Sequence, residues 1–328
     1  MTLVLSHADV SGSLSVDDVI ATVRAGLDEQ AAGNVQLPPR ITIDSTAGYG
    51  WLRLMPAILN GSRVMGFKAM HSTPGIGVGY IVLLYDLPTG ELLAQLDADW
   101  LTAQRTAATA AVAADLLARK EIACVGLLGS SAQARTMLTA VSRIRDLRRV
   151  KVFSPTRSHR EAFARSISES LSIDVEPVDS AMRAVRESDL VLSAFRASGT
   201  PVVMADWLAP GTHVNAVSSV RPGARELDDD VWRKCTVVAV DDRVHALESG
   251  DGRSALASGA LSAEKAAELW EIHQRRRQGR PDEDSITLFK SVGTALQDLA
   301  LAKAIYDHAV AKGLGKDIGT FPAMRPNS

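Results

Sequence analysis

The sequence predicts an α/β protein in which a doubly wound parallel sheet is joined to a smaller α+β domain. From about residue 120 onward, short apolar stretches alternate with helical patterns, and such alternation gives right-handed βαβ crossovers and a parallel sheet. Residues 40–97 instead contain short alternating runs separated by turn residues, which is typical of an antiparallel sheet. The length of 328 residues is sufficient for two domains.

The first half begins with a short strand and a helix. Leu3–Leu5 is the strand, and the helix is expected over Val16–Asn34. Ser15 can cap this helix, because the acidic residues Asp17 and Asp18 then fall in its first turn. A turn at Pro88–Glu91 joins two of the strands that follow. The strands expected in this half are Arg40–Asp44, Trp51–Met55, Gly79–Asp86 and Leu92–Leu96.

The second half begins with a helix over Thr102–Arg119, which is rich in Ala and Leu and contains neither Gly nor Pro. A long helix, Ser291–Ala311, is expected near the end, and the tail Asp317–Ser328 is expected to be loosely ordered. Six strands are expected between these helices: Ile122–Leu128, Val150–Phe153, Ile173–Pro177, Leu190–Ser193, His213–Val217 and Val237–Val240.

Composition excludes several functional classes. The formal net charge is -2 and no run of Lys or Arg stands out, which disfavours nucleic acid as a partner. No apolar stretch has the length of a membrane span and no signal peptide is visible, so we expect a cytoplasmic protein without a membrane partner. Cys124 and Cys235 lie far apart without metal-type spacing, so neither a disulfide framework nor a metal site is predicted. Cys124 is expected to be buried and inert.

A glycine-containing turn follows the first strand of the second half. Gly129, Ser131 and Ala134 stand at the three positions of the G-x-G-x-x-G/A dinucleotide fingerprint. The glycine permits a tight turn, the alanine permits close packing of helix on strand, and free amides at the helix N-terminus can hold a pyrophosphate. An ordinary βα turn is the alternative. The residues expected to bind the cofactor here are Gly129, Ser130, Ser131, Ala132 and Gln133.

The end of the second strand bears on the choice between NAD and NADP. NAD-dependent enzymes usually place an acidic residue there to bind the ribose 2′-hydroxyl. In this sequence no acid occurs before Glu161, and the stretch instead offers the donors Ser154 and Thr156 and the cation Arg157. This composition favours NADP(H). NAD(H), bound through the backbone and Ser154, is the alternative.

Three cations in the first half stand in unusual surroundings. Lys68 lies inside an apolar, strand-like run, and Arg40 follows two prolines. Arg105 falls in the first turn of its predicted helix, where a cation opposes the helix dipole unless an anion lies nearby. Together they are suited to converge on a carboxylate, with bidentate pairing from the guanidinium groups.

These segments resemble the ornithine cyclodeaminase/mu-crystallin family. The matching stretches occur in the family's order over about residues 38–310. They are Pro38–Arg40, Leu54–Pro56, Gly66–Lys68, Leu101–Ala108, the Gly129 loop, Asn215–Val217, Arg221–Pro222, Glu226–Asp228 and Phe289–Gly293.

The resemblance implies an N-terminal domain that binds substrate and dimerises, formed by residues 1–115 together with 296–328, and a Rossmann domain over residues 116–295. It implies that Arg40, Lys68 and Arg105 hold a substrate carboxylate, and that the protein is a homodimer. It also assigns further contacts with the cofactor to Asn215, Val217, Lys290, Ser291 and Gly293.

One departure from the family pattern bears on the reaction. Ornithine cyclodeaminases carry an aspartate five positions after the asparagine of the Asn-Ala motif, whereas Val220 stands there in this chain. Valine cannot accept a proton, which disfavours ornithine cyclisation and an alanine-dehydrogenase chemistry that uses the same carboxylate. Arg221-Pro222 and Glu226–Asp228 are more similar to the mu-crystallin, ketimine reductase branch, although that branch usually has a hydroxyl at the position of Val220.

These features predict an oxidoreductase that reduces a small 2-imino acid, cyclic or acyclic (such as iminosuccinate), to the 2-amino acid. Lys68 is the first candidate proton donor, because burial between arginines would lower its pKa towards neutrality. His71, three residues on, is the second candidate. Arg53 and Arg221, with His71, are candidates for holding a second carboxylate. An amino acid dehydrogenase and a non-catalytic NADP-binding protein are the alternatives.

Overall fold

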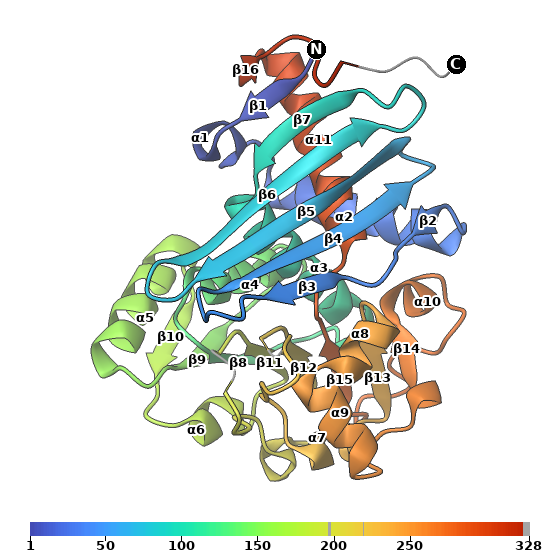
Figure 1. Ribbon diagram of the computed structural model, residues 1–328. Helices are drawn as coiled ribbons and strands as arrows, with labels where there is room; N and C mark the ends of the chain where they lie inside the picture. Colours follow the sequence, from blue (N-terminus) through green and yellow to red (C-terminus); the bar gives the residue numbers. More distant parts are fainter. Residues whose placement is uncertain (196–197, 219, 324–328) are drawn as a thin grey trace. The chain divides into compact units, whose positions relative to one another are not determined.

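A computed structural model describes residues 1–195, 198–218 and 220–323, and the chain divides into two compact units (Figure 1). Met1–Arg105 and Thr294–Ser328 form the first unit, and Thr106–Gly293 form the second. The division after Arg105 falls within helix α3 (Asp99–Leu117), whereas the boundary expected from the sequence follows residue 115. No helix among the described residues is both long and apolar enough to cross a bilayer.

The first unit contains a sheet with strand order β16-β1-β7-β6-β5-β4-β2, and β3 pairs with β4. Every pair in it is antiparallel except β1 with β7, which confirms the mostly antiparallel character predicted for this half. Its strands are β1 (Leu3–Leu5), β2 (Val35–Gln36), β3 (Ile41–Asp44), β4 (Trp51–Leu59), β5 (Val64–Thr73), β6 (Gly77–Asp86), β7 (Leu92–Asp97) and β16 (Lys316–Asp317).

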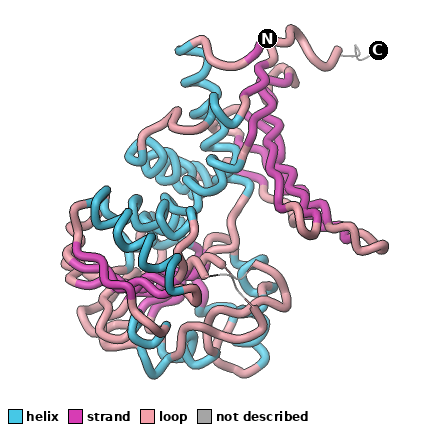
Figure 2. Tube along the Cα trace, turned by 90° about the vertical axis from the view of Figure 1, so that its left-hand side faces the viewer, coloured by secondary structure: helices cyan, strands magenta, loops and turns pink. Residues whose placement is uncertain are grey.

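Helices cover one face of this sheet (Figure 2). α2 (Val16–Ala31) begins at Ser15, whose hydroxyl accepts a hydrogen bond from the amide of Asp18 in a capping box, as the sequence predicts. α11 (Ala295–Lys312) packs on α2 and on strands β4, β5 and β6. A four-residue helix, α1 (His7–Val10), follows β1. We call the face of the sheet that α11 covers the inner face, and the opposite face the outer face.

Residues on β5 alternate between these two faces. Lys68 contacts α11, and a Cβ added to Gly66 would lie 3.4 Å from Leu299 of the same helix. Side chains point alternately to opposite faces along a strand, so the even-numbered residues from 64 to 72 face inward. The odd-numbered residues from 65 to 71, which include Phe67 and His71, face outward. This alternation determines which of the predicted site residues can meet.

The second unit is a parallel sheet of order β10-β9-β8-β11-β12-β15-β13-β14. The order reverses between β8 and β11, so the carboxyl ends of these two strands form the topological switch point at which such sheets bind ligands. The strands are β8 (Cys124–Leu128), β9 (Arg149–Phe153), β10 (Asp174–Pro177), β11 (Leu190–Ser193), β12 (His213–Ala216), β13 (Val237–Val240), β14 (Ala266–Glu268) and β15 (Thr287–Lys290).

The helices of the second unit lie between these strands in sequence. They are α4 (Ala132–Ser142), α5 (Arg157–Leu171), α6 (Ala181–Val185), α7 (Asp229–Lys234), α8 (Arg243–Glu248), α9 (Gly250–Ala257) and α10 (Leu269–His273), with 3-10 turns at Ala205–Trp207 and Ala263–Lys265. All six strands predicted for this half are present. β14 and β15 were not predicted, because each contributes only two or three apolar residues to its run.

Several local predictions require correction. The last helix begins at Ala295 rather than Ser291, because Thr294 is its N-cap. Helix α3 begins at Asp99, so Arg105 lies in the second turn and not in the first. Cys124 is only partly buried, since it opens strand β8.

The C-terminal tail is more ordered at its start than predicted. β16 (Lys316–Asp317) pairs with β1, and Ile318 donates a backbone hydrogen bond to Thr2. The last part of the predicted loose tail, residues 324–328, lies outside the described residues.

Candidate active site

Lys68 lies in the middle of β5 with its ammonium group fully buried on the inner face. Its Nζ donates a hydrogen bond to Oδ1 of Asp298, at 2.7 Å. Arg105 Nε donates to the same oxygen, at 2.9 Å, and Arg105 Nη1 donates to Oε1 of Gln297, at 3.0 Å. One carboxylate in the first turns of α11 therefore fixes two buried cations side by side.

The surroundings of Lys68 lower its pKa. Burial is the largest cause, and it brings the pKa to about 7 together with the positive charges of Arg105 and Arg40, against which Asp298 acts by raising it. This is the direction that the sequence argument expects. A lysine with such a pKa can both hold and release a proton near neutral pH.

Arg40 completes a group of three cations in the first unit. It immediately precedes β3, whose first pair joins Ile41 to Leu54. Continuing this register places Arg40 beside Met55, and Met55 pairs with Lys68 on β5. The half-buried Arg40 and the buried Lys68 thus flank Met55 on the inner face. The electrostatic effect of Arg40 on the pKa of Lys68 agrees with this arrangement.

His71 does not join this group. It lies three residues after Lys68 in the same strand, and an odd offset puts the two side chains on opposite faces. The His71 ring lies on the outer side, where it fills the space in which a Cβ on Gly79 would stand, and it is exposed. The structure therefore separates the second candidate proton donor from the first.

Asp298 and Gln297 were not among the predicted site residues. Both are buried in a helix that is otherwise rich in Ala and Leu. A charged residue is almost never fully buried without a partner. An aspartate at a buried position of the last helix was therefore the available signal that it neutralises the buried cations of the first half.

The predicted dinucleotide loop forms the turn between β8 and α4. Gly129 has φ of +114°, and a Cβ there would lie 2.6 Å from the carbonyl oxygen of Ala194, so only glycine fits. Ser131 is the N-cap of α4, and its hydroxyl accepts a hydrogen bond from the amide of Ala134, at 3.3 Å. The loop Gly129–Gln133 thus leads into a helix N-terminus at the switch point of the sheet. That arrangement fits a pyrophosphate.

The loop after β9 contains no carboxylate up to Glu161. The hydroxyl of Ser130 donates to that of Ser154, at 3.0 Å, which ties this loop to the preceding turn. Thr156 is the N-cap of α5. Arg157 is exposed and its Nε donates to Glu161, at 2.7 Å, so the first acid after the strand is engaged by an arginine.

Asn215 and Val217 lie at the end of β12. The side chain of Asn215 is buried, its Nδ2 donates to the carbonyl of Ala110, at 2.9 Å, and its Oδ1 is 3.1 Å from Nε2 of His213. Burial lowers the pKa of His213 to about 3, so the imidazole is neutral and takes part in a core network. Val217 follows the strand and is half-buried.

Lys290, at the end of β15, belongs to a buried ionic cluster that the sequence did not predict. Its Nζ donates to Oε1 of Glu226, at 2.5 Å, and lies 3.2 Å from Oδ2 of Asp251. Burial alone would lower the pKa of Lys290, but the two carboxylates outweigh it and raise that pKa. Ser193, at the end of β11, donates to the other oxygen of Glu226, at 2.7 Å.

The loop that follows Lys290 is held by Asp241, another residue that was not predicted. Oδ2 of Asp241 accepts hydrogen bonds from the hydroxyl of Ser291, at 2.7 Å, and from the amide of Gly293, at 2.8 Å. These contacts explain why the last helix starts only after Gly293. Val220 is partly buried and packs against the hydrophobic core of the second unit.

Known proteins of similar sequence and structure cover nearly the whole chain. A Thermococcus litoralis Δ1-pyrroline-2-carboxylate reductase, solved with NADH and L-proline, is 34% identical with a TM-score of 0.92, over 96% of this chain and 100% of that one. An archaeal alanine dehydrogenase, solved as a dimer with bound NAD, is 33% identical with a TM-score of 0.90, over 97% and 99%. Mouse ketimine reductase mu-crystallin is 33% identical over 90% and 92%. Residues 1–313 match the ornithine cyclodeaminase/mu-crystallin family as a whole, and the chain therefore belongs to that family.

Proposed function

We propose that this protein is an oxidoreductase that reduces a small 2-imino acid to the corresponding 2-amino acid. The observation that carries the proposal is the group formed by Arg40, Lys68 and Arg105, in which the central lysine has a pKa of about 7. Such a group can bind a carboxylate and supply a proton. Similarity to a pyrroline-2-carboxylate reductase and to a ketimine reductase supports this reaction class.

In the proposed mechanism the first unit binds the substrate. Arg40 and Arg105 hold its carboxylate, the guanidinium of Arg105 being fixed by Asp298 and Gln297. When bound, a reduced nicotinamide would supply the hydride for the imine carbon. Lys68 provides the proton that the imine nitrogen requires, directly or by keeping the nitrogen protonated, so that one C=N bond becomes one CH–NH bond. Cyclodeamination would need a carboxylate at position 220 to remove a proton, and Val220 cannot act as that base.

The second unit supplies the dinucleotide site of this proposal. The cradle at Gly129, which any Cβ would fill, and the amides at the start of α4 fit a pyrophosphate. We favour NADP(H), because Ser154, Thr156 and Arg157 occupy the stretch in which NAD enzymes place an acid. NAD(H) is the alternative, and two relatives were solved with NADH or NAD. Further contacts are proposed for the segments at Asn215–Val217 and Lys290–Gly293.

The experiment that tests this function compares imine reduction with cyclodeamination. Purified protein is given Δ1-pyrroline-2-carboxylate with NADPH or NADH, and separately L-ornithine with the oxidised cofactors. We expect cofactor oxidation with the imine, a higher kcat/KM with NADPH than with NADH, and no proline from ornithine. Proline formation from ornithine at a comparable kcat would contradict the proposal. Cofactor binding without any turnover would instead favour a non-catalytic binding protein.

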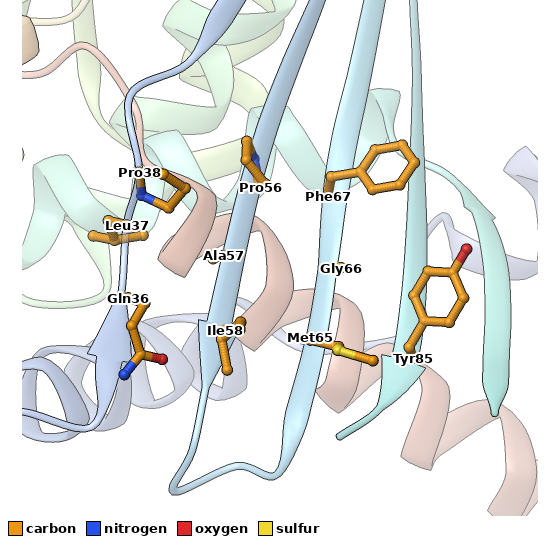
Figure 3. A pocket seen from close by; sticks show the side chains of 10 residues that line it. All are labelled: Gln36, Leu37, Pro38, Pro56, Ala57, Ile58, Met65, Gly66, Phe67 and Tyr85. Atoms are coloured by element: carbon orange, nitrogen blue, oxygen red, sulfur yellow. The ribbon is translucent and has the colours of Figure 1, made fainter. Parts of the chain in front are cut away.

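We also propose that the first unit dimerises through the outer face of its sheet. That face carries an apolar hollow with a volume of about 710 Å³, lined by residues of β2, β4, β5 and β6 and of the segment after β2 (Figure 3). Pro56, Phe67 and Tyr85 project from it on the side away from α11. Large apolar patches of this kind mark interaction sites, and a second copy is the proposed occupant because a relative was solved as a dimer.

Placing a charge in this hollow is expected to dissociate the dimer. A Phe67→Glu variant should elute as a monomer at concentrations at which the wild type is a dimer, because a buried unpaired carboxylate is costly. Light scattering coupled to size exclusion measures the mass. Val310→Glu, on the exposed surface of α11, is the matched control and should stay dimeric. A monomeric wild type, or a dimeric Phe67→Glu variant, would contradict the assignment.

We also propose that the protein is located in the cytoplasm. Cys124 and Cys235 are both free thiols, which suits a reducing compartment.

A further inference from the structure

We propose that Arg53 binds a second carboxylate of the substrate, so that the preferred substrate is a short-chain 2-imino dicarboxylic acid. This inference rests on the proposed function and narrows its substrate class. The imine of oxaloacetate is the simplest compound that fits. Of the three residues that the sequence suggested for a second carboxylate, Arg53 is the one that shares the inner face of the first unit with Lys68.

The strand register places Arg53 next to the predicted carboxylate site. Arg53 pairs with Met70 on β5, and Met70 lies two residues after Lys68 on the same face. Arg53 and Lys68 are therefore diagonal cross-strand neighbours, a relation that separates residues by about 7–8 Å and lies within reach of long side chains. His71, by contrast, faces outward, and Arg221 belongs to the second unit.

Contacts with its neighbours orient the guanidinium of Arg53. Its Nε donates to the hydroxyl of Thr42, at 2.9 Å, and its Cζ lies 5.3 Å from the centre of the Trp51 ring. The residue is 8% exposed although it is an arginine. A planar guanidinium that is already ordered loses little entropy when it pairs with a carboxylate, and it favours bidentate geometry.

The residues that lie in line with Arg53 across the sheet suit the carbon chain of a dicarboxylic substrate. Met70 separates Arg53 from Tyr80 across the three strands, so an apolar side chain lies between two polar ones. Burial raises the pKa of Tyr80, followed by the effect of Asp99, while Arg105 lowers it, so the phenol is a neutral donor near Arg105. A short carbon chain would lie over Met70, with carboxylates at its two ends.

The charges on this face favour a dianion. Among the described residues of the first unit, Asp298 is the buried carboxylate on the face that carries Arg40, Arg53, Lys68 and Arg105. The other carboxylates on or beside this face, Asp44 and Asp99, are exposed. A monocarboxylate would leave Arg53 without a substrate partner, and a substrate with a distal ammonium group would meet a like charge there. The positive charge of Arg53 therefore disfavours ornithine independently of Val220.

The test compares two substrates and three proteins. The substrates are Δ1-pyrroline-2-carboxylate and iminosuccinate generated from oxaloacetate and ammonia, and the proteins are the wild type, Arg53→Leu and the control Lys303→Met on the exposed side of α11. We expect the wild type to prefer iminosuccinate. Arg53→Leu should lower kcat/KM for iminosuccinate roughly 10–100-fold and leave that for the cyclic monocarboxylate within about threefold. Lys303→Met should change neither.

The outcomes separate this inference from the proposed function. Equal losses on both substrates, or a wild type that prefers the monocarboxylate, would overturn the role of Arg53 while imine reduction stands. If neither imine is reduced, the proposed function fails, and ligand-induced shifts in the melting temperature by L-aspartate and by L-alanine still test the second subsite. An equal shift in the wild type and in Arg53→Leu would then refute it. Should Arg53→Leu not fold, Arg53→Lys replaces it, with a smaller loss expected on iminosuccinate alone.

Discussion

Replacing Lys68 with methionine is expected to lower kcat/KM for imine reduction roughly 10²–10⁴-fold, the range associated with loss of a general acid. Methionine is similar in length and apolar, so it can occupy the buried position on β5, and Asp298 keeps its hydrogen bond from Arg105. Steady-state NAD(P)H oxidation measures the effect. Lys303→Met, which removes a half-buried lysine of the same unit that pairs with Asp307, is the control and should retain the wild-type rate.

The same lysine predicts a pH profile. Its pKa is lowered to about 7, so the protonated form is present below that pH and is lost as the pH rises through it. For the wild type, kcat/KM should therefore fall with rising pH above about 7. The Lys68→Met variant should show only a low rate without this descending limb. A descending limb that persists in Lys68→Met would remove Lys68 from the proton transfer.

Asp298→Asn is expected to move this profile to lower pH. The carboxylate raises the pKa of Lys68 through its charge and its hydrogen bond, so its neutralisation should lower that pKa further. The rate at pH 7 should then fall and recover partly when the pH is lowered. Asn keeps an oxygen at hydrogen-bond distance from Lys68 and Arg105. The KM should rise as well, because Arg105 loses its ionic partner.

Asp307→Asn is the matched control, since it removes an exposed aspartate that pairs with Lys303 on the same helix. It should leave the pH profile of kcat/KM unchanged. A rate loss in Asp298→Asn that is the same at every pH would show that Asp298 supports only the packing of α11. Removing one partner of a buried ion pair costs about 3–5 kcal/mol of folding stability. Thermal melting therefore checks that Asp298→Asn is still folded at the assay temperature.

Local sequence features predicted the turn between β8 and α4 well. The turn at Gly129 depends on one strand, one glycine and one helix start that follow each other directly in the chain, and the residues that define it are close in sequence. The same holds for the capping of α2 by Ser15. Where the determinant is local, propensity and spacing contain most of the information.

The partners of the buried cations could not be read from local patterns. Asp298 lies 230 positions after Lys68 in the chain, and Glu226 lies 64 positions before its partner Lys290. Only the fold brings such charges together. The suggestion of His71, in contrast, was avoidable, because the strand period of two already separates it from Lys68.

Short strands with polar ends were the second feature that local sequence patterns did not predict. β15 reads Thr-Leu-Phe-Lys, and its polar ends have hydrogen-bond partners. These are the buried His213 and the half-buried Arg280 for Thr287, and the buried Glu226 for Lys290. Such pairing lets polar residues enter a central strand, and no sequence window shows it. The order of the parallel sheet likewise depends on pairings between strands that are distant in sequence.

The most direct test of the central claim, that the substrate is a preformed imine, is the ammonia-free reaction. Wild-type protein is mixed with Δ1-pyrroline-2-carboxylate and reduced cofactor in a buffer without ammonia, and cofactor oxidation is compared with proline formation. The account predicts rapid oxidation with one proline formed per cofactor consumed. Failure to oxidise the cofactor with this imine, together with oxidation when pyruvate and ammonia are both added, would contradict it and identify an amino acid dehydrogenase.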